Sequence, residues 1–120
     1  IDGAWRVFTH GGRTATDLDA VQWACECERR GAGEILLTSV DRDGSRDGYD
    51  IELTRAVADS VNVPVIASGG AGSARDVVAA IQLGHADAAL VAGILHDATT
   101  TISELKTYMT ASLIPVRNAA

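Results

Sequence analysis

Cysteine and histidine are scarce in this sequence, and their spacing excludes much of the chemistry they often support. The two cysteines, Cys25 and Cys27, stand two residues apart in a helical pattern. They therefore point to different faces and suit neither a shared metal ion nor a mutual disulfide. The three histidines lie in unrelated segments without a ligand spacing. The sequence predicts free thiols in a reduced compartment, and neither a metal nor another cofactor.

Positive charge and long apolar runs are also lacking. Ten Lys and Arg residues stand against sixteen Asp and Glu, which gives a net charge of −6. This balance argues against nucleic acid or an anionic membrane as a partner, because both attract dense basic patches. No apolar run approaches the roughly 20 residues that span a bilayer, and no basic-then-apolar leader is present. We expect a cytoplasmic protein with a single domain and a modest core.

Three short apolar runs are the clearest structural signal in the chain. They cover residues 34–39, 63–68 and 88–92, and turn-forming residues bound each of them. Their hydrophobicity is continuous rather than alternating, which is typical of parallel strands buried on both faces by helices.

Helical patterns separate these runs. Residues 17–30 carry an apolar stripe and stop at Gly31, and residues 51–61 repeat the pattern. Ser73 with Asp76, and Thr101 with Glu104, resemble capping boxes that open two further helices. The stripe of the first helix comprises Leu18, Val21, Ala24 and Cys25.

The order of elements predicts an α/β fold. After an N-terminal loop or hairpin in residues 1–15, βα units fill residues 16–120, so we expect parallel strands with right-handed crossovers and outer helices. The pattern alone fits either an open doubly wound sheet or an arc of a barrel, and three strands complete neither.

Two strand ends are rich in small residues. The second strand runs into S-G-G-A-G-S, which is either a phosphate cradle at a helix N-terminus or a tight turn that needs glycine for its backbone angles. The third strand ends at Ala92-Gly93, and this second small-residue end favours the cradle, because barrels often build phosphate sites from their last two loops.

The first strand runs into D-R-D-G. If the backbone stays extended, Asp41 and Asp43 point to opposite sides, so that one lines the cavity while the other pairs with Arg42. The segment is then either a source of acid–base catalysis or a solvated charged loop with an Asp-Gly turn.

The segment L-L-T-S-x-D-R-D-G-x-x-x-G-Y-D, followed by an apolar helix and P-V-I-A-S-G-G-A-G, resembles the cyclase subunits of imidazole glycerol phosphate synthase. The likeness covers essentially all 120 residues and corresponds to the C-terminal half of that (βα)8 TIM barrel. The sister isomerase of the same histidine pathway shares the R-D-G and S-G-G frame, but it reads T-D-x-x-R-D-G-T where this chain has T-S-V-D-R-D-G-S. The cyclase is therefore favoured.

The resemblance implies a function. Cyclases of this family take ammonia from a glutaminase subunit through the barrel interior and use it to cyclise and cleave a ribulosyl aminoimidazole carboxamide nucleotide. Asp43 matches a catalytic aspartate, and Glu34 matches a charged residue of the ring where ammonia enters. Gly93 departs from the usual Ser, which removes a hydroxyl contact. The positions that match one phosphate site are Thr38, Gly44, Gly69, Gly70, Ala92 and Gly93.

The resemblance also implies what one half-barrel lacks. The resemblance places the second catalytic aspartate on the strand just before residue 1 and the other phosphate site in the first half of the family's barrel, so the chain alone is expected to be an inactive lyase fragment. The alternative is a non-catalytic half-barrel module that binds phosphate ion and associates with itself. We expect a homo-oligomer that buries the barrel interior, built from Leu36, Val65, Ala67, Ala89 and Val91 or their neighbours.

Overall fold

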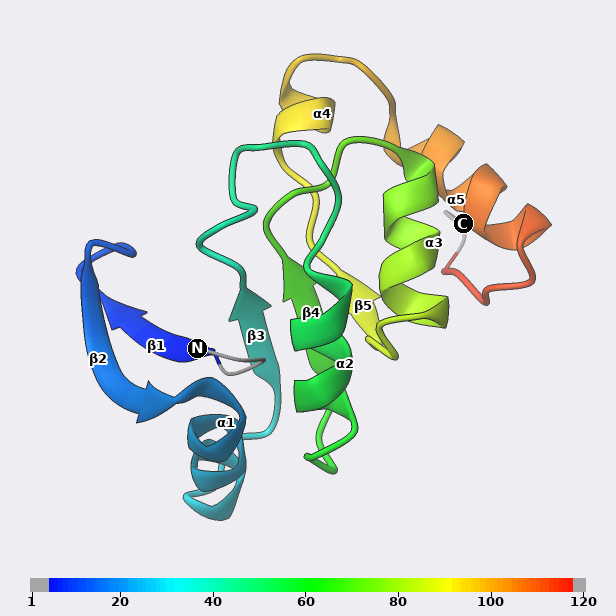
Figure 1. Cartoon of the computed structure of the whole chain (residues 1–120). Coiled ribbons are helices and arrows are strands. Elements are labelled where there is room, and N and C mark those ends of the chain that lie inside the picture. The colour runs from blue at the N-terminus through cyan, green and yellow to red at the C-terminus, as the bar shows by residue number, and fades with distance from the viewer. Residues whose placement is uncertain (1–4, 118–120) are drawn as a thin grey trace.

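The computed structural model describes residues 5–117, which form a hairpin and a parallel sheet with helices around them (Figure 1). In the hairpin, β1 (Arg6–Thr9) pairs with β2 (Thr14–Asp19) in antiparallel fashion. The parallel sheet has the order β3-β4-β5, with β3 at Ile35–Thr38, β4 at Val65–Ser68 and β5 at Ala88–Ala89. The helices are α1 (Ala20–Arg29), α2 (Ile51–Ala58), α3 (Ala74–Gln82), α4 (Gly93–His96) and α5 (Ile102–Ala111).

The first helix starts three residues later than its pattern predicts. Asp19 is the N-cap, and its carboxylate accepts a hydrogen bond from the Gln22 amide at 2.9 Å. Residues 17–19 instead extend β2, so the hairpin runs past residue 15 and Leu18 is 45% exposed. Asp19 pairs with Arg6 of β1 beyond an irregularity in the register, and the same aspartate ends the strand by capping the helix.

The predicted capping boxes differ in outcome. At α3, Ser73 and Asp76 form both halves of the box, as predicted. At α5, the Thr101 hydroxyl accepts from the Glu104 amide at 3.1 Å, but the Glu104 carboxylate accepts from the Thr100 hydroxyl instead. The second box is therefore only half formed.

The two faces of the sheet have different environments, and the sequence prediction assigned them wrongly. Val65 and Ala67 are fully buried, and they pack against apolar residues of α1, α2, α3 and α5. Ala89 and Val91 join the same helix-side core. Only Leu36 of the predicted interior residues lies on the other face, where it is 57% exposed and in register with Ile66. Side chains alternate along a strand, so the open face comprises Leu36, Ile66, Ala88 and Leu90.

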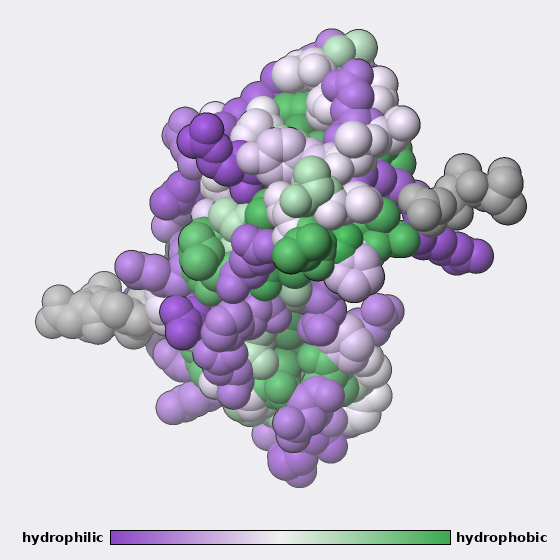
Figure 2. Space-filling model, turned by 90° about the vertical axis from the view of Figure 1, so that its right-hand side faces the viewer, coloured by the Kyte–Doolittle hydropathy of each residue, from purple (hydrophilic) through white to green (hydrophobic). Residues whose placement is uncertain are grey.

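A second apolar region lies beside β5. Hydrophobic residues gather across the middle of the side of the molecule that carries α5 (Figure 2), where Ile102 and Tyr108 are among the exposed large side chains. A pocket of about 590 Å³ lies between α3, β5 and α5. Within residues 5–117, no helix combines the length and the apolar character needed to cross a membrane.

Candidate functional site at the strand ends

The carboxyl ends of β3, β4 and β5 lie together at the top of the sheet in Figure 1, below α4. Three connections leave from this edge: the long loop 39–50, the glycine-rich turn 69–73 and the short turn 90–92. Thr38 and Ser68 are register partners at the last paired position of β3 and β4. In parallel α/β folds this edge is where loops bring functional groups together.

The loop after β3 folds back at once instead of continuing in extended form. The Ser39 carbonyl accepts hydrogen bonds from the amides of Arg42 and Asp43, at 3.3 and 2.9 Å, and the Ser39 amide donates to the Ser68 carbonyl. This single turn seats the Asp43 backbone beside Gly69, where an added Cβ would lie 3.4 Å from the Asp43 Cα. The backbone is therefore not extended here, so the condition under which Asp41 and Asp43 would point to opposite sides is not met.

Arg42 also differs from the expected ion pair with a neighbouring aspartate. Its guanidinium donates to the backbone carbonyls of Asp47 and Gly48, at 3.2 and 3.4 Å. Asp43 is exposed at the loop surface, and the ion pairs found among residues 5–117 do not include it. Its carboxylate is accessible to a ligand.

The G-Y-D motif fastens the far end of the loop, a role that the sequence interpretation missed. The Gly48 amide donates to the Gly70 carbonyl at 2.8 Å, and the buried Tyr49 hydroxyl donates to the Leu90 carbonyl at 2.7 Å. Asp50 then caps α2 by accepting from the Leu53 amide. Gly48 and Tyr49 thus tie the loop to the turns after β4 and β5, and Asp50 starts the helix that follows. An aromatic residue directly before a helix-capping Asp was the available signal.

Close packing of backbone against backbone explains the glycines of the turn after β4. A Cβ on Gly70 would lie 2.2 Å from the Gly48 carbonyl oxygen, and one on Gly72 would lie 2.2 Å from that of Arg46. Gly70 also has a φ of +113°, which side-chain-bearing residues rarely adopt. The loop from β3 could not approach a turn built from larger residues.

Free hydrogen-bond donors remain in this turn and at the first residue of α4. The Asp76 carboxylate accepts from the amides of Gly72 and Ser73, at 2.9 and 3.2 Å, so the end of α3 is already capped. Among residues 5–117, no protein acceptor is found for the amides of Gly69, Gly70 and Gly93. An anion held here would meet these amides and not the capped first turn of α3.

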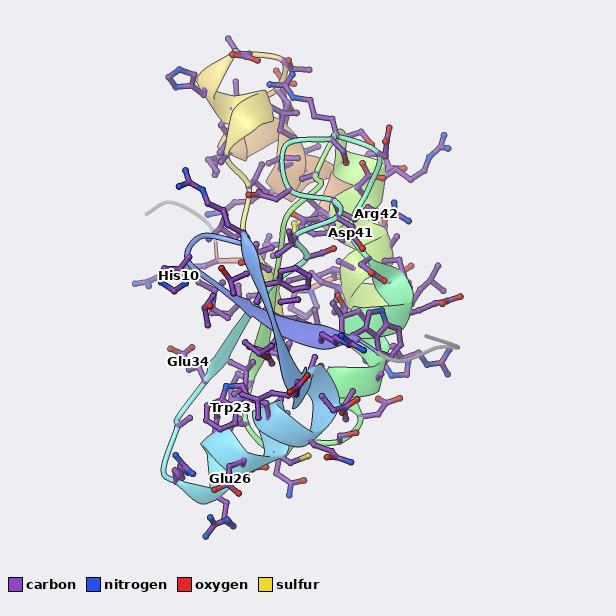
Figure 3. The ribbon with its side chains drawn as sticks, turned by 60° about the vertical axis from the view of Figure 1, so that its left-hand side comes forward. His10, Trp23, Glu26, Glu34, Asp41 and Arg42 are labelled. Atoms are coloured by element: carbon purple, nitrogen blue, oxygen red, sulfur yellow. The ribbon has the colours of Figure 1, made fainter. Side chains whose placement is uncertain are left out.

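The predicted site residues separate into two groups. One group gathers at the carboxyl ends of the strands and comprises Thr38, Asp43, Gly44, Gly69, Gly70, Ala92 and Gly93. Glu34 lies apart at the amino-terminal end of β3, away from Asp41 and Arg42 (Figure 3). The structure thus places Glu34 at the opposite mouth of a barrel to which this sheet would belong.

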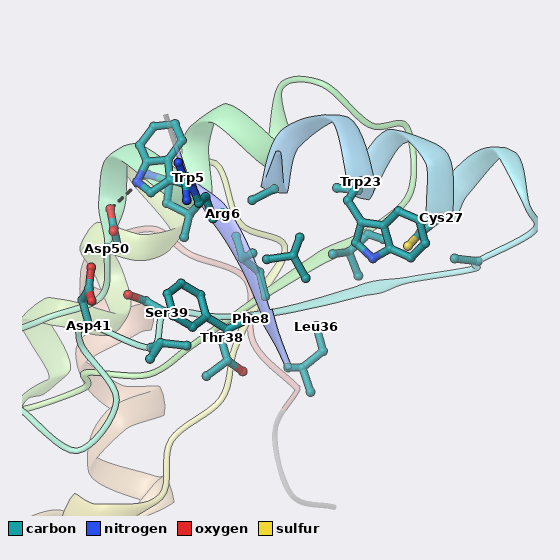
Figure 4. Close-up of a pocket in the computed structure, with 18 of the residues that line it drawn as sticks. Trp5, Arg6, Phe8, Trp23, Cys27, Leu36, Thr38, Ser39, Asp41 and Asp50 are labelled. Atoms are coloured by element: carbon teal, nitrogen blue, oxygen red, sulfur yellow. Dashed lines mark hydrogen bonds between the residues drawn. The ribbon is translucent and has the colours of Figure 1, made fainter. Parts of the chain in front are cut away.

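A pocket lies beside the free edge of β3. It has a volume of about 730 Å³ and lies between the hairpin, α1 and β3 (Figure 4). Its walls include Trp5, Phe8, Trp23 and Leu36, with Asp41 at one end. This groove is apolar and does not include the glycine turns.

No cluster of three or more His, Cys, Asp or Glu side chains suited to a metal ion occurs in residues 5–117. Both cysteines are free and half-buried: Cys25 lies 3.5 Å from the Ser60 carbonyl, and Cys27 lines the groove beside β3.

Comparison with known proteins defines the class first. The family described as histidine biosynthesis protein matches residues 1–101, and the chain belongs to this family. Its members are (βα)8 barrels, and the parallel sheet with outer helices seen here is part of such a barrel, which confirms the predicted fold class.

A curated relative belongs to the same type of subunit that the sequence motifs indicate. The chain is 66% identical over 114 residues to imidazole glycerol phosphate synthase subunit HisF of Myxococcus xanthus. The match covers 95% of this chain and 45% of the relative, so the chain spans about half the length of that protein. The resemblance to cyclase subunits is confirmed.

Removal of the Tyr49 hydroxyl tests the anchoring of the loop. We expect Tyr49→Phe to lower the free energy of unfolding by about 1–2 kcal/mol at pH 7, because the Leu90 carbonyl loses its donor. Burial, and then the Asp76 carboxylate, raise the pKa of Tyr49 above its ordinary value of 10.0. Because the pKa of Tyr49 is higher in the folded than in the unfolded protein, the hydroxyl contributes its full stabilisation below pH 10. This stabilisation is lost as the pH rises above 10, where the unfolded protein loses the proton first.

The difference in unfolding free energy between the wild type and Tyr49→Phe should therefore be smaller at pH 11 than at pH 7, by about 1 kcal/mol. Urea unfolding at pH 7 and pH 11 measures it, and Tyr108→Phe, at a 44% exposed tyrosine, is the matched control. Equal stability of wild type and Tyr49→Phe at both pH values would show that the hydroxyl does not hold the loop.

Proposed function

We propose that this chain forms the half of an imidazole glycerol phosphate synthase cyclase that carries one catalytic carboxylate and one substrate-phosphate site. The observation that carries the proposal is the convergence of Asp43, the Gly69-Gly70 turn and Gly93 at adjacent strand ends. The 66% identity to a cyclase subunit supports it independently.

The proposed reaction is ammonia-dependent cyclisation and cleavage of a ribulosyl aminoimidazole carboxamide nucleotide. It gives imidazole glycerol phosphate and an aminoimidazole carboxamide ribotide, and it needs proton transfers at more than one centre. Asp43 is the proposed acid or base of this half, because it is exposed on a loop that the G-Y-D motif holds in place. Its opposed partner carboxylate would come from another strand of the barrel.

The proposed phosphate site uses backbone donors. The amides of Gly69, Gly70 and Gly93 supply the hydrogen bonds, and Thr38, Gly44 and Ala92 border the site. Preorganised amides bind an oxyanion without the ordering of long side chains. The site would also explain why these donors lack protein acceptors among residues 5–117.

The remaining proposals concern partners and location. Glu34, at the amino-terminal end of β3, suits the ring through which a glutaminase subunit delivers ammonia, because ammonia would then travel along the open face toward Asp43. Cytoplasmic location stays a prediction from the sequence.

A half-barrel by itself exposes its interior face. Leu36 and Leu90 are 57% and 42% exposed, and the groove beside β3 is apolar. Burial of a few hundred Å² at roughly 25 cal/mol per Å² stabilises a contact by several kcal/mol. In the absence of the other half, a second copy of the chain is the proposed cover, in a two-fold arrangement. A non-catalytic module that binds phosphate and associates in this way is the alternative function.

A chimera separates the catalytic proposal from the alternative. The matching segment of the Myxococcus xanthus subunit is replaced by this chain, and ammonia-dependent turnover is measured. Asp43→Asn should lower kcat by about 10²- to 10⁴-fold, since a positioned acid or base is removed. Asp41→Asn, in the same loop and equally exposed, is the control and should leave kcat nearly unchanged.

The isolated 120-residue chain is the baseline of this assay and should show no turnover. An unchanged kcat in Asp43→Asn would remove Asp43 from its proposed role, and an equal loss in Asp41→Asn would show that the effect is not specific to Asp43. Turnover of the isolated chain near that of the chimera would refute the division of the active site between two halves.

Sedimentation equilibrium at micromolar concentration tests the assembly. We expect a dimer for the wild type and a monomer for Leu36→Glu, because a buried unpaired carboxylate opposes association. Leu113→Glu makes the same change at a residue that is 91% exposed outside the open face, and it should remain dimeric. A folded wild-type monomer that binds no hydrophobic dye would contradict the proposed cover.

A further inference from the structure

The side chain of Arg46 occupies the space directly over Gly93. A Cβ built on Gly93 would lie 2.9 Å from Nη2, 3.3 Å from Nε and 3.5 Å from Cζ of this guanidinium. Gly93 has no positive φ that would itself demand glycine. The guanidinium thus occupies the space that a side chain at the first residue of α4 would take.

Two contacts hold Arg46 in this position. Its guanidinium forms an ion pair with Asp97, the C-cap of α4, and both side chains are about half exposed. Its backbone has a φ of +60°, uncommon for a residue with a side chain, and its carbonyl packs on Gly72. The loop after β3 thus passes over the turn after β4 and places the positive charge of Arg46 beside the turn after β5.

Arg46 differs from the other arginine of this loop in what it can still bind. Arg42 donates to two backbone carbonyls within the loop itself. The partner found for Arg46 among the described residues is one side-chain carboxylate, and a guanidinium presents five donors. Donors remain for an anion that also meets the Gly93 amide.

We propose that Arg46 is a phosphate-binding residue, and that its guanidinium takes the place of a side chain at residue 93. The inference rests on the proposed phosphate site and adds to it the one charged group. Asp97 is a positioning residue that keeps the guanidinium over Gly93 when no anion is bound. The planar guanidinium can bind phosphate oxygens in a bidentate manner, and its positive charge attracts a doubly charged phosphate more strongly than a singly charged anion.

The test is the Kd for inorganic phosphate, obtained from amide chemical shifts of the chain. Arg46→Gln should raise Kd about ten- to a hundredfold, as expected for a charge-assisted hydrogen bond. Arg55→Gln removes the same charge on α2, where Arg55 lies 3.7 Å from Asp59, and should leave Kd within about twofold.

Gly93→Ala is a more specific test of the position of Arg46. Its Cβ displaces the guanidinium, while the amide of residue 93 remains. It should weaken binding in the wild type but have little further effect in the Arg46→Gln background, so the two changes are not additive. Thermal unfolding should change little on Gly93→Ala in either background, because the far end of a flexible arginine side chain can move aside at low cost.

The outcomes distinguish this inference from the proposed function. If the wild type binds no phosphate, the proposed phosphate site fails and Arg46 has no role in it. If the wild type binds phosphate and Arg46→Gln binds it equally well, the site stands and the inference about Arg46 is overturned. If Gly93→Ala and Arg46→Gln had additive effects on the binding free energy of phosphate, the inference that the Cβ of residue 93 displaces the Arg46 guanidinium would be overturned.

Discussion

The backbone of the loop after β3 rests directly on the glycine turn after β4, and the arrangement of the strand ends depends on this contact. Gly48 bonds to Gly70 at 2.8 Å, and an added methyl group on Gly70 would overlap the Gly48 carbonyl. Tyr49 extends the attachment to β5 through the Leu90 carbonyl. Because three strand ends are joined in this way, groups that are distant in sequence hold fixed positions relative to one another.

The attached loop determines which charged residues lie at the strand ends. One side of the loop places Asp43 beside Gly69, and the other side carries Arg46 to Gly93. The Asp43 backbone thus lies beside Gly69 and the Arg46 guanidinium beside Gly93, and the amides of both glycines have no acceptor among residues 5–117. A substrate with a phosphate at one end and a reacting group at the other could be oriented by this spacing, since positioning supplies a large part of catalysis.

Much of this could be predicted from the sequence, because continuous apolar runs and helix caps report on local chemistry. The capping box of Ser73 and Asp76 is an example. The faces of the strands could not be predicted: Val65 and Leu36 are equally apolar, and a run buried on both sides contains no alternation to show which residues meet the helices. The contacts of Tyr49 and Arg46 span 41 and 51 residues. They follow from how the loops pack, which no local pattern encodes.

A crystal structure of the chain grown in phosphate tests the central claim, that the joined strand ends form one anion site. The account predicts an ordered anion within hydrogen-bonding distance of the Gly70 and Gly93 amides, with the loop of Gly48 and Tyr49 in place. Ordered phosphate found only elsewhere on the molecule, with these amides bonded to other groups, would contradict it.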